Sequence, residues 1–200
     1  MSHGGGSDSW IITRLTDSAS WDAFMAANPR ASKSAPSVCR LEPFDPRYAH
    51  RVLSWISSPE EAYWVAPRTA PPLTAEEVLQ WQAPGHQPFL LYETEHPEPI
   101  GYGELNVLGG SGRRYWLGHL ILDPAHRGRG VGQQLTRLLI WRAFTRHAAH
   151  EVSLVVFPEN RQAILCYEAA GMRPDGYETH ELASYSRRVR LLRMVARGLT

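Results

Sequence analysis

Apolar residues in the second half of the chain follow two spacings, one typical of helices and one typical of strands. Between residues 130 and 147, four apolar side chains starting at Val131 fall at i, i+4, i+7 and i+8, which predicts one apolar helix face. Residues 152–157 form a nearly continuous apolar run, as expected of a strand buried on both faces. A helix followed by a fully buried strand is typical of a sheet covered by helices.

The rest of the pattern extends this sheet on both sides. Thr74 caps one predicted helix, and Glu77 three residues later completes a capping box. Asn160 caps another helix, which Gly171 ends. Strands are predicted at 38–41, 89–92, 100–108, 115–122, 172–181 and 188–196, a helix at 47–57, and a hairpin loop at 109–112. This order, with a strand–helix–strand crossover near its centre, predicts a mixed α/β sheet.

The first 37 residues carry a weaker pattern than the rest. A short strand at 10–12 and a helix at 21–25 are possible there, while residues 28–37 have the Ser, Ala and Pro content of a linker. Residues 1–7 lack the layout of a signal peptide and are expected to form a flexible tail. We therefore expect a weakly structured extension over 1–37 and one domain over 38–200.

Composition narrows the class of protein. The 200 residues are 43% hydrophobic with a net charge of +1, enough for one core and too balanced to indicate nucleic acid or an acidic membrane surface. Cys39 and Cys166 do not make a disulfide framework, which favours a cytoplasmic protein. No apolar run approaches the roughly 18 residues that span a bilayer. A small organic substrate or a protein segment remains open as the ligand.

The most informative segment runs from a strand into a glycine-rich turn that opens the long helix. Gly128, Gly130 and Gly132 expose backbone N–H groups at the positive end of a helix, which predicts a phosphate site that Arg127 and Arg129 can support. The Gly-Lys-Ser/Thr ending of a Walker loop is absent, and the glycine spacing is not that of a dinucleotide fingerprint. The alternative is a tight turn with no ligand.

Several segments together resemble the GCN5-related N-acetyltransferase (GNAT) superfamily. Residues 127–132 look like its Arg/Gln-x-x-Gly-x-Gly/Ala loop, and residues 120–124 look like the end of its fourth strand. Residues 160–172 are similar to its Asn-x-x-Ala-x-x-x-Tyr-x-x-x-Gly-Phe segment, with a final methionine in place of phenylalanine. Residues 99–104 resemble its third strand. The likeness covers roughly residues 38–196.

This resemblance implies a GNAT fold, with splayed fourth and fifth strands and helices on both faces of the sheet. It also implies acetyl-CoA or another acyl-CoA as cofactor, direct transfer of the acyl group to an amine, and no metal. A backbone N–H near Leu120 or Ile121 would polarise the thioester carbonyl. The resemblance assigns cofactor contacts to Leu120, Ile121, Leu122, Arg127, Gly128, Arg129, Gly130, Val131, Gly132, Asn160 and Tyr167.

Proton transfer is assigned to a general acid and a general base. Tyr167 matches the acid of the family, and its alternative role is a core aromatic. Trp116, Gly118 and Val155 match positions where relatives carry a base, and none of these three residues can act as one. Two candidates remain, besides a chain of waters. Glu104 on the third strand is preferred, while His119 faces the other side of its strand unless a bulge turns it.

The acceptor side is expected from the first two helices, their loop and the final hairpin. Tyr63, Trp64 and Trp116 are the candidate acceptor contacts, because aromatic rings can flank a cationic amine. Trp55 and Trp81 are expected to pack in the core. The acceptor would be a small molecule such as an aminoglycoside or polyamine, or a protein N-terminus or lysine. The protein would be a monomer or homodimer.

Two other functions remain open at this point. A non-catalytic acyl-CoA sensor of the same fold would keep the glycine loop and lack turnover. A phosphate-binding domain for another nucleotide would prefer ATP or NAD to CoA. No nucleic acid or membrane partner is expected.

Overall fold

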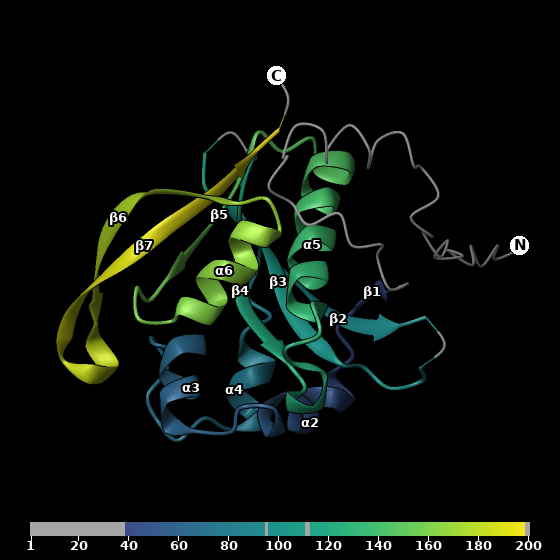
Figure 1. Ribbon diagram of the computed structural model, residues 1–200. Helices are drawn as coiled ribbons and strands as arrows, with labels where there is room; N and C mark the ends of the chain where they lie inside the picture. Colours follow the sequence, from purple (N-terminus) through teal and green to yellow (C-terminus); the bar gives the residue numbers. More distant parts are fainter. Residues whose placement is uncertain (1–38, 95, 111–112, 199–200) are drawn as a thin grey trace, which may run out of the picture.

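A seven-stranded mixed sheet organises the chain in the order β1-β2-β3-β4-β5-β7-β6 (Figure 1). The structure, a computed structural model, describes residues 39–94, 96–110 and 113–198. The strands are β1 (Cys39–Pro43), β2 (His86–Glu93), β3 (Gly101–Leu108), β4 (Arg114–Leu122), β5 (Glu151–Val156), β6 (Arg173–Leu182) and β7 (Arg187–Arg197). The helices are α2 (Ala49–Ser54), α3 (Pro59–Val65), α4 (Ala75–Gln80), α5 (Val131–His147) and α6 (Arg161–Ala169), with 3-10 turns at Pro46–Tyr48, Pro124–His126 and Ala183–Tyr185. The predicted mixed α/β class is confirmed.

The β4 and β5 strands form the parallel pair in this sheet, and they soon part. Their register begins at Arg114 opposite Glu151 and ends at Trp116 opposite Ser153. Beyond Trp116, β4 continues to Leu122 with β3 as its partner on one side. Figure 1 shows the two strands diverging in the direction of α3 and α4. The predicted splay of the fourth and fifth strands is therefore present, and α5 and α6 each follow one of the separated strands.

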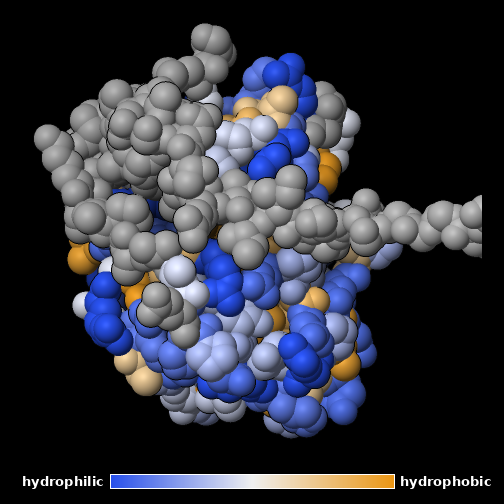
Figure 2. Space-filling model, turned by 90° about the vertical axis from the view of Figure 1, so that its right-hand side faces the viewer, coloured by the Kyte–Doolittle hydropathy of each residue, from blue (hydrophilic) through white to orange (hydrophobic). Residues whose placement is uncertain are grey.

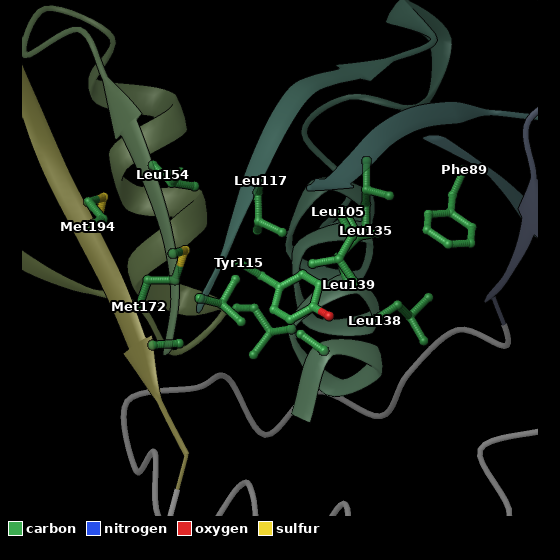
Figure 3. Close-up of a cluster of buried hydrophobic side chains, with 14 of the residues drawn as sticks. Phe89, Leu105, Tyr115, Leu117, Leu135, Leu138, Leu139, Leu154, Met172 and Met194 are labelled. Carbon is green, nitrogen blue, oxygen red and sulfur yellow. The ribbon is translucent and has the colours of Figure 1, made fainter. Parts of the chain in front are cut away.

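Helices cover both faces of the sheet, and each face has its own core. On one face α5 packs against β1, β3 and β4, where Leu105, Leu117, Leu135 and Leu139 are among the buried residues (Figure 3). On the other face α2 and α4 pack over a second cluster. That cluster contains Phe44, Val52, Trp55, Val78, Trp81, Leu90, Tyr102 and Ile121. Alternation along β3 and β4 explains this division, since successive side chains point to opposite faces.

The helices confirm some of the predicted elements and differ from others. The long helix spans Val131–His147, and Thr74 and Glu77 form the capping box of α4. The predicted helix at 47–57 is instead a 3-10 turn followed by the short α2. The α3 helix lies where a loop was expected, although Ser58 is a good N-cap residue that accepts from the Glu61 N–H at 3.1 Å. The predictions for residues 1–38 and for residues 111–112 of the hairpin loop lie outside the described residues.

The surface on the side of β1 and β2 is mainly hydrophilic. Figure 2 shows hydrophobic side chains there in small, separate groups among the residues that the structure describes. No helix in the described ranges is long and apolar enough to cross a membrane.

Candidate active site

The glycine loop follows the separated end of β4 and opens α5. Gly128 and Gly130 have φ angles of +72° and +79°, a left-handed conformation in which glycine avoids strain. A Cβ added at either position would meet nothing within 4 Å. Gly130 is the N-cap of the 17-residue α5, so the free N–H groups of its first turn follow directly. The loop thus combines open space with the positive end of a long helix, as a phosphate site requires.

Gly132 has a different role from the other two glycines. A Cβ there would lie 3.0 Å from the Cys166 sulfur and 3.3 Å from a Leu122 methyl group. Glycine at this position therefore lets the first turn of α5 approach α6 and the end of β4 closely. Val131 is 2% exposed and packs in the core, so only its backbone can reach a ligand in the loop.

Arg127 is joined to α2 and α3, where the acceptor side was expected. Its guanidinium donates to Glu61 Oε1 at 2.6 Å, to the Trp55 carbonyl at 2.6 Å and to the Leu122 carbonyl at 3.2 Å. The pKa of Glu61 is lowered, because hydrogen bonds from Arg127 and the Ser57 N–H outweigh the effect of burial. The side chain that was predicted to support a phosphate therefore ties the end of β4 to α2 and α3. Exposed Arg129 remains the other arginine of the loop.

The α6 helix places Asn160 and Tyr167 next to the separated strands. The Asn160 side chain accepts from the Ala163 N–H at 3.1 Å and so caps α6, which is a structural role besides the predicted cofactor contact. Tyr167 is half-buried and packs against the α5-face core. Burial, with a smaller contribution from Cys166, raises the pKa of the Tyr167 phenol, so at neutral pH it carries its proton. That is the state a general acid needs.

A β-bulge turns His119 to the face that carries Glu104. Tyr102 pairs with Ile121 and Glu104 pairs with Gly118, so two residues of β4 lie opposite one residue of β3. His119 has φ +44°, an uncommon conformation for a residue with a side chain. The following Leu120 packs against the core on the α5 face. The alternation that would separate His119 from Glu104 is broken at this bulge.

Glu104 is the buried centre of a polar network. Its carboxylate is 0% exposed and accepts from Tyr102 Oη at 2.8 Å, Asn106 Nδ2 at 2.8 Å and His119 Nδ1 at 2.7 Å. Burial alone would raise the pKa of Glu104, but hydrogen bonds and the charge of His119 more than offset it, so the net pKa is lowered. Burial, together with the neighbouring carboxylate, raises the pKa of Tyr102. Glu104 is therefore ionised and fixed in place at neutral pH.

Gly118 leaves the space that this carboxylate occupies. A Cβ at Gly118 would lie 3.0 Å from Glu104 Oε2 and 2.7 Å from the ring of Trp116. Trp116 in turn meets the His86 ring edge-on at 6.0 Å. A carboxylate on β3 thus reaches the side of β4, where Trp116 and Gly118 themselves offer no base. Sequence reasoning named Glu104 and His119 separately, and the structure brings them into contact.

The candidate acceptor residues on α3 pack against the final hairpin. Tyr63 contacts the ring of Phe157 at 4.7 Å and that of Tyr185 at 4.8 Å between centroids. Trp64 borders the same cluster of Phe157, Leu182 and Leu191. The expected neighbourhood of α3 and the hairpin is present, with both aromatic residues engaged in packing. Trp116 lies apart from them, beside Glu104 and His86.

Sequence reasoning missed the part that Trp81 plays beside this network. The Trp81 ring lies parallel to the His119 ring, with 3.9 Å between centroids and 3° between planes. Trp81 was expected to pack in the core, and it does so within the α2/α4 cluster. No signal in the sequence pairs it with His119, because their contact depends on the bulge.

The profile of the acetyltransferase (GNAT) family matches residues 35–172, more than half of the chain. The chain belongs to the acetyltransferase (GNAT) family. Among relatives, the aminoglycoside N(6′)-acetyltransferases type 1 of Klebsiella pneumoniae and Serratia marcescens are each 32% identical over 92 residues. That alignment covers 41% of this chain and 46% of each relative, so the match spans about half the length of these proteins.

Solved structures of other GNAT proteins have the same fold. An aminoglycoside acetyltransferase in complex with coenzyme A superimposes with a TM-score of 0.63 at 20% identity, covering 80% of this chain and 94% of that one. The Vibrio cholerae spermidine N-acetyltransferase in complex with CoA and spermine gives a TM-score of 0.67 at 19% identity, covering 81% and 96%. The likeness confirms the predicted GNAT architecture.

Proposed function

We propose that the protein is an N-acetyltransferase that moves the acetyl group of acetyl-CoA to a primary amine of a small molecule. The observation that carries this proposal is the loop at Gly128 and Gly130, open and left-handed at the start of α5, beside strands that separate after Trp116. Membership in the GNAT family supports the same activity. The relatives named for aminoglycosides and spermidine support a small cationic acceptor.

The described residues fit the cofactor at two places. The amides from Gly128 to Gly132 would hold the pyrophosphate, because no side chain fills the space at the first two loop glycines. On β4, residues beyond Trp116 have no partner on β5, so their backbone is open to an extended ligand. The Leu122 carbonyl already accepts from Arg127, which leaves Leu120 and Ile121 as the freer part of this edge. No group of side chains suited to a metal is found within the described ranges.

Three parts of the chain would divide the chemistry. Bound acetyl-CoA supplies an acetyl group activated as a thioester. A β4 N–H near Leu120 or Ile121 would donate to the carbonyl oxygen, Tyr167 would give a proton to the departing sulfur, and the Glu104–His119 pair would take one from the amine. In the overall balance the ammonium loses two protons. One ends on the thiol of CoA and the other leaves to solvent.

Calorimetric titration with acetyl-CoA tests the cofactor half of the proposal, with ATP and NAD as controls. Micromolar binding of acetyl-CoA alone is expected, followed by release of free thiol when aminoglycosides or polyamines are added. A folded protein that gives no heat with acetyl-CoA would show that the loop is only a turn or holds another anion.

A non-catalytic acyl-CoA sensor is the second candidate, favoured by the lack of a base at Trp116, Gly118 and Val155. Replacing Tyr167 with phenylalanine separates the two. For an enzyme, Y167F is expected to lower kcat by about 100-fold or more, since a positioned acid contributes on that scale, and to leave acetyl-CoA affinity unchanged. Thiol release and calorimetry on the same preparation give both numbers. A sensor would show no turnover in either form.

A further inference from the structure

Trp81 is placed beside the reaction side of the sheet in a way that packing alone does not explain. It follows α4 and is 7% exposed, and its indole Nε1 is a buried donor with no hydrogen-bond partner within the described residues. Leaving such a donor unpaired costs about 1–3 kcal/mol, which a phenylalanine or leucine would avoid. The indole face, at 3.9 Å from the His119 ring, is the feature that a smaller apolar residue would not reproduce.

The hydrogen bonds of Glu104 settle which nitrogen of His119 is free. An ionised carboxylate only accepts, so the proton lies on His119 Nδ1, which donates to Oε1 at 2.7 Å. In the neutral ring the lone pair is then on Nε2, for which no partner exists among the described side chains and backbone groups. The His119 side chain is 16% exposed. Nε2 is therefore the basic atom of the network.

Two neighbours hold the His119 ring from different sides. The Glu104 carboxylate faces Nδ1, and the Trp81 indole offers its electron-rich face to the whole ring. The left-handed backbone of His119 adds a third constraint, since such strain persists only where the surroundings hold it. Glu104 is the charged group in contact with the ring, and Tyr102, Asn106 and His86 surround its carboxylate, with His86 Nδ1 3.6 Å from Glu104 Oε2.

We propose that His119 Nε2 takes the proton of the acceptor ammonium, and that Trp81 and Glu104 are the positioning residues that hold its ring. The N–H bond of the ammonium breaks, its electron pair stays on nitrogen for attack on the acetyl carbon, and the proton bonds to Nε2. This role rests on the proposed function. The ring's tautomer and its response to Trp81 do not.

The first test is therefore independent of turnover. Nitrogen-15 NMR of the histidine rings, with the His119 signal identified by its loss in H119Q, reports which nitrogen carries the proton. We expect the Nδ1–H tautomer in the neutral ring of wild type, loss of that single tautomer in E104Q, and displaced His119 ring signals in W81L, because the stacked indole is removed. An Nε2–H tautomer in wild type, or ring signals unchanged in both variants, would overturn the proposal.

Variants at Trp81 and at a neighbouring tryptophan separate the effect of stacking on His119 from the effect of loosened core packing. W81F keeps an aromatic face and is expected to displace the His119 ring signals less than W81L. W55L removes a tryptophan of the same cluster, 3% exposed and not stacked on His119, and should leave those signals where they are. A shift of equal size in W55L would assign the effect to loosened packing and contradict a specific role for Trp81.

Kinetics then test the role of the base. H119Q is expected to lower kcat by about 100-fold or more without changing acetyl-CoA affinity. W81L and E104Q should lower kcat by less than H119Q and should also leave acetyl-CoA affinity unchanged. Wild-type kcat in H119Q would refute the base. A wild-type protein without turnover, but with the expected tautomer and shifts, would refute the proposed function and leave the positioning by Trp81 and Glu104 standing.

Discussion

At the scale of single residues, the site depends on the lack of a side chain at Gly118. Gly118 pairs with Glu104 across β3 and β4, and its missing Cβ leaves the volume in which the carboxylate lies. A base on β4 and a carboxylate on β3 would compete for this volume. The residue types of Glu104 and His119 were enough to name them as candidates from the sequence. Their contact was not predictable, because it depends on one extra residue in β4 that alternation does not reveal.

A methyl group at Gly118 tests this close approach. G118A is expected to displace the Glu104 carboxylate or the Trp116 ring, since the new Cβ would lie within 3.0 Å of both. We expect kcat to fall by about tenfold or more, as misplacement of a catalytic group does, with acetyl-CoA affinity kept. Steady-state kinetics and calorimetry check this. G109A, where a Cβ meets nothing within 4 Å, is the control, and equal activity in both variants would contradict the argument.

Backbone conformation, and not space, is the constraint at Gly130. G130A meets no atom within 4 Å but places a side chain at φ +79°. The expected cost is about 1 kcal/mol of unfolding free energy. Urea denaturation measures it, and G130N is expected to recover part of the loss, because asparagine tolerates the left-handed region better. If alanine and glycine are equally stable there, the loop does not hold this conformation in solution.

At the scale of helices and strands, Arg127 joins the glycine loop to α2 and α3. The salt bridge to Glu61 fixes α3 against the end of β4, and Glu61 also accepts from the Ser57 N–H at 2.8 Å. The loop motif alone indicated a phosphate ligand at Arg127. Two of its observed partners, Glu61 and Trp55, lie more than sixty positions away, which no local pattern reveals.

Neutralising Glu61 should loosen α3 without touching the glycine loop. E61Q is expected to raise the KM of the amine acceptor several-fold and to cost about 1 kcal/mol or less of stability, as partly exposed ion pairs do. Acetyl-CoA affinity should stay within about twofold. E60Q, an exposed neighbour on the same helix, is the control. A loss of acetyl-CoA affinity with unchanged acceptor KM would place Arg127 at the cofactor instead.

The elements that the sequence predicted best are those whose signals are local. The long helix, its apolar face and the α4 capping box follow from spacing and cap chemistry over a few residues. The α2 and α3 helices are six and seven residues long, too short to set up a clear period. Their stability comes from packing against the sheet and the hairpin, which is a property of the fold and not of the segment.

At the scale of the whole molecule, the buried carboxylate links stability to pH. The pKa of Glu104 is lower in the folded protein than the ordinary value of about 4.3, so its contribution is present above that value and is lost as pH falls through the folded one. Urea unfolding at several pH values between about 7 and 3 should show the stability advantage of wild type over E104Q shrinking toward the acid end. A difference that stays constant over this range would mean that Glu104 is not ionised in the fold.

The Glu104–Gly118 pair has a consequence for how such a site can change over generations. The carboxylate could be carried by β3 or by β4, but not beside a side chain on the other strand, because a Cβ at Gly118 would lie 3.0 Å from Glu104 Oε2. Each single exchange, E104G or G118E, would empty or overfill the same volume, whereas the double exchange moves the acid across the sheet and keeps one carboxylate in it. The two positions are therefore expected to change together in evolution, because each single variant would be less active than both the wild type and the double variant. Comparing the activity of the double variant with that of both single variants tests this directly.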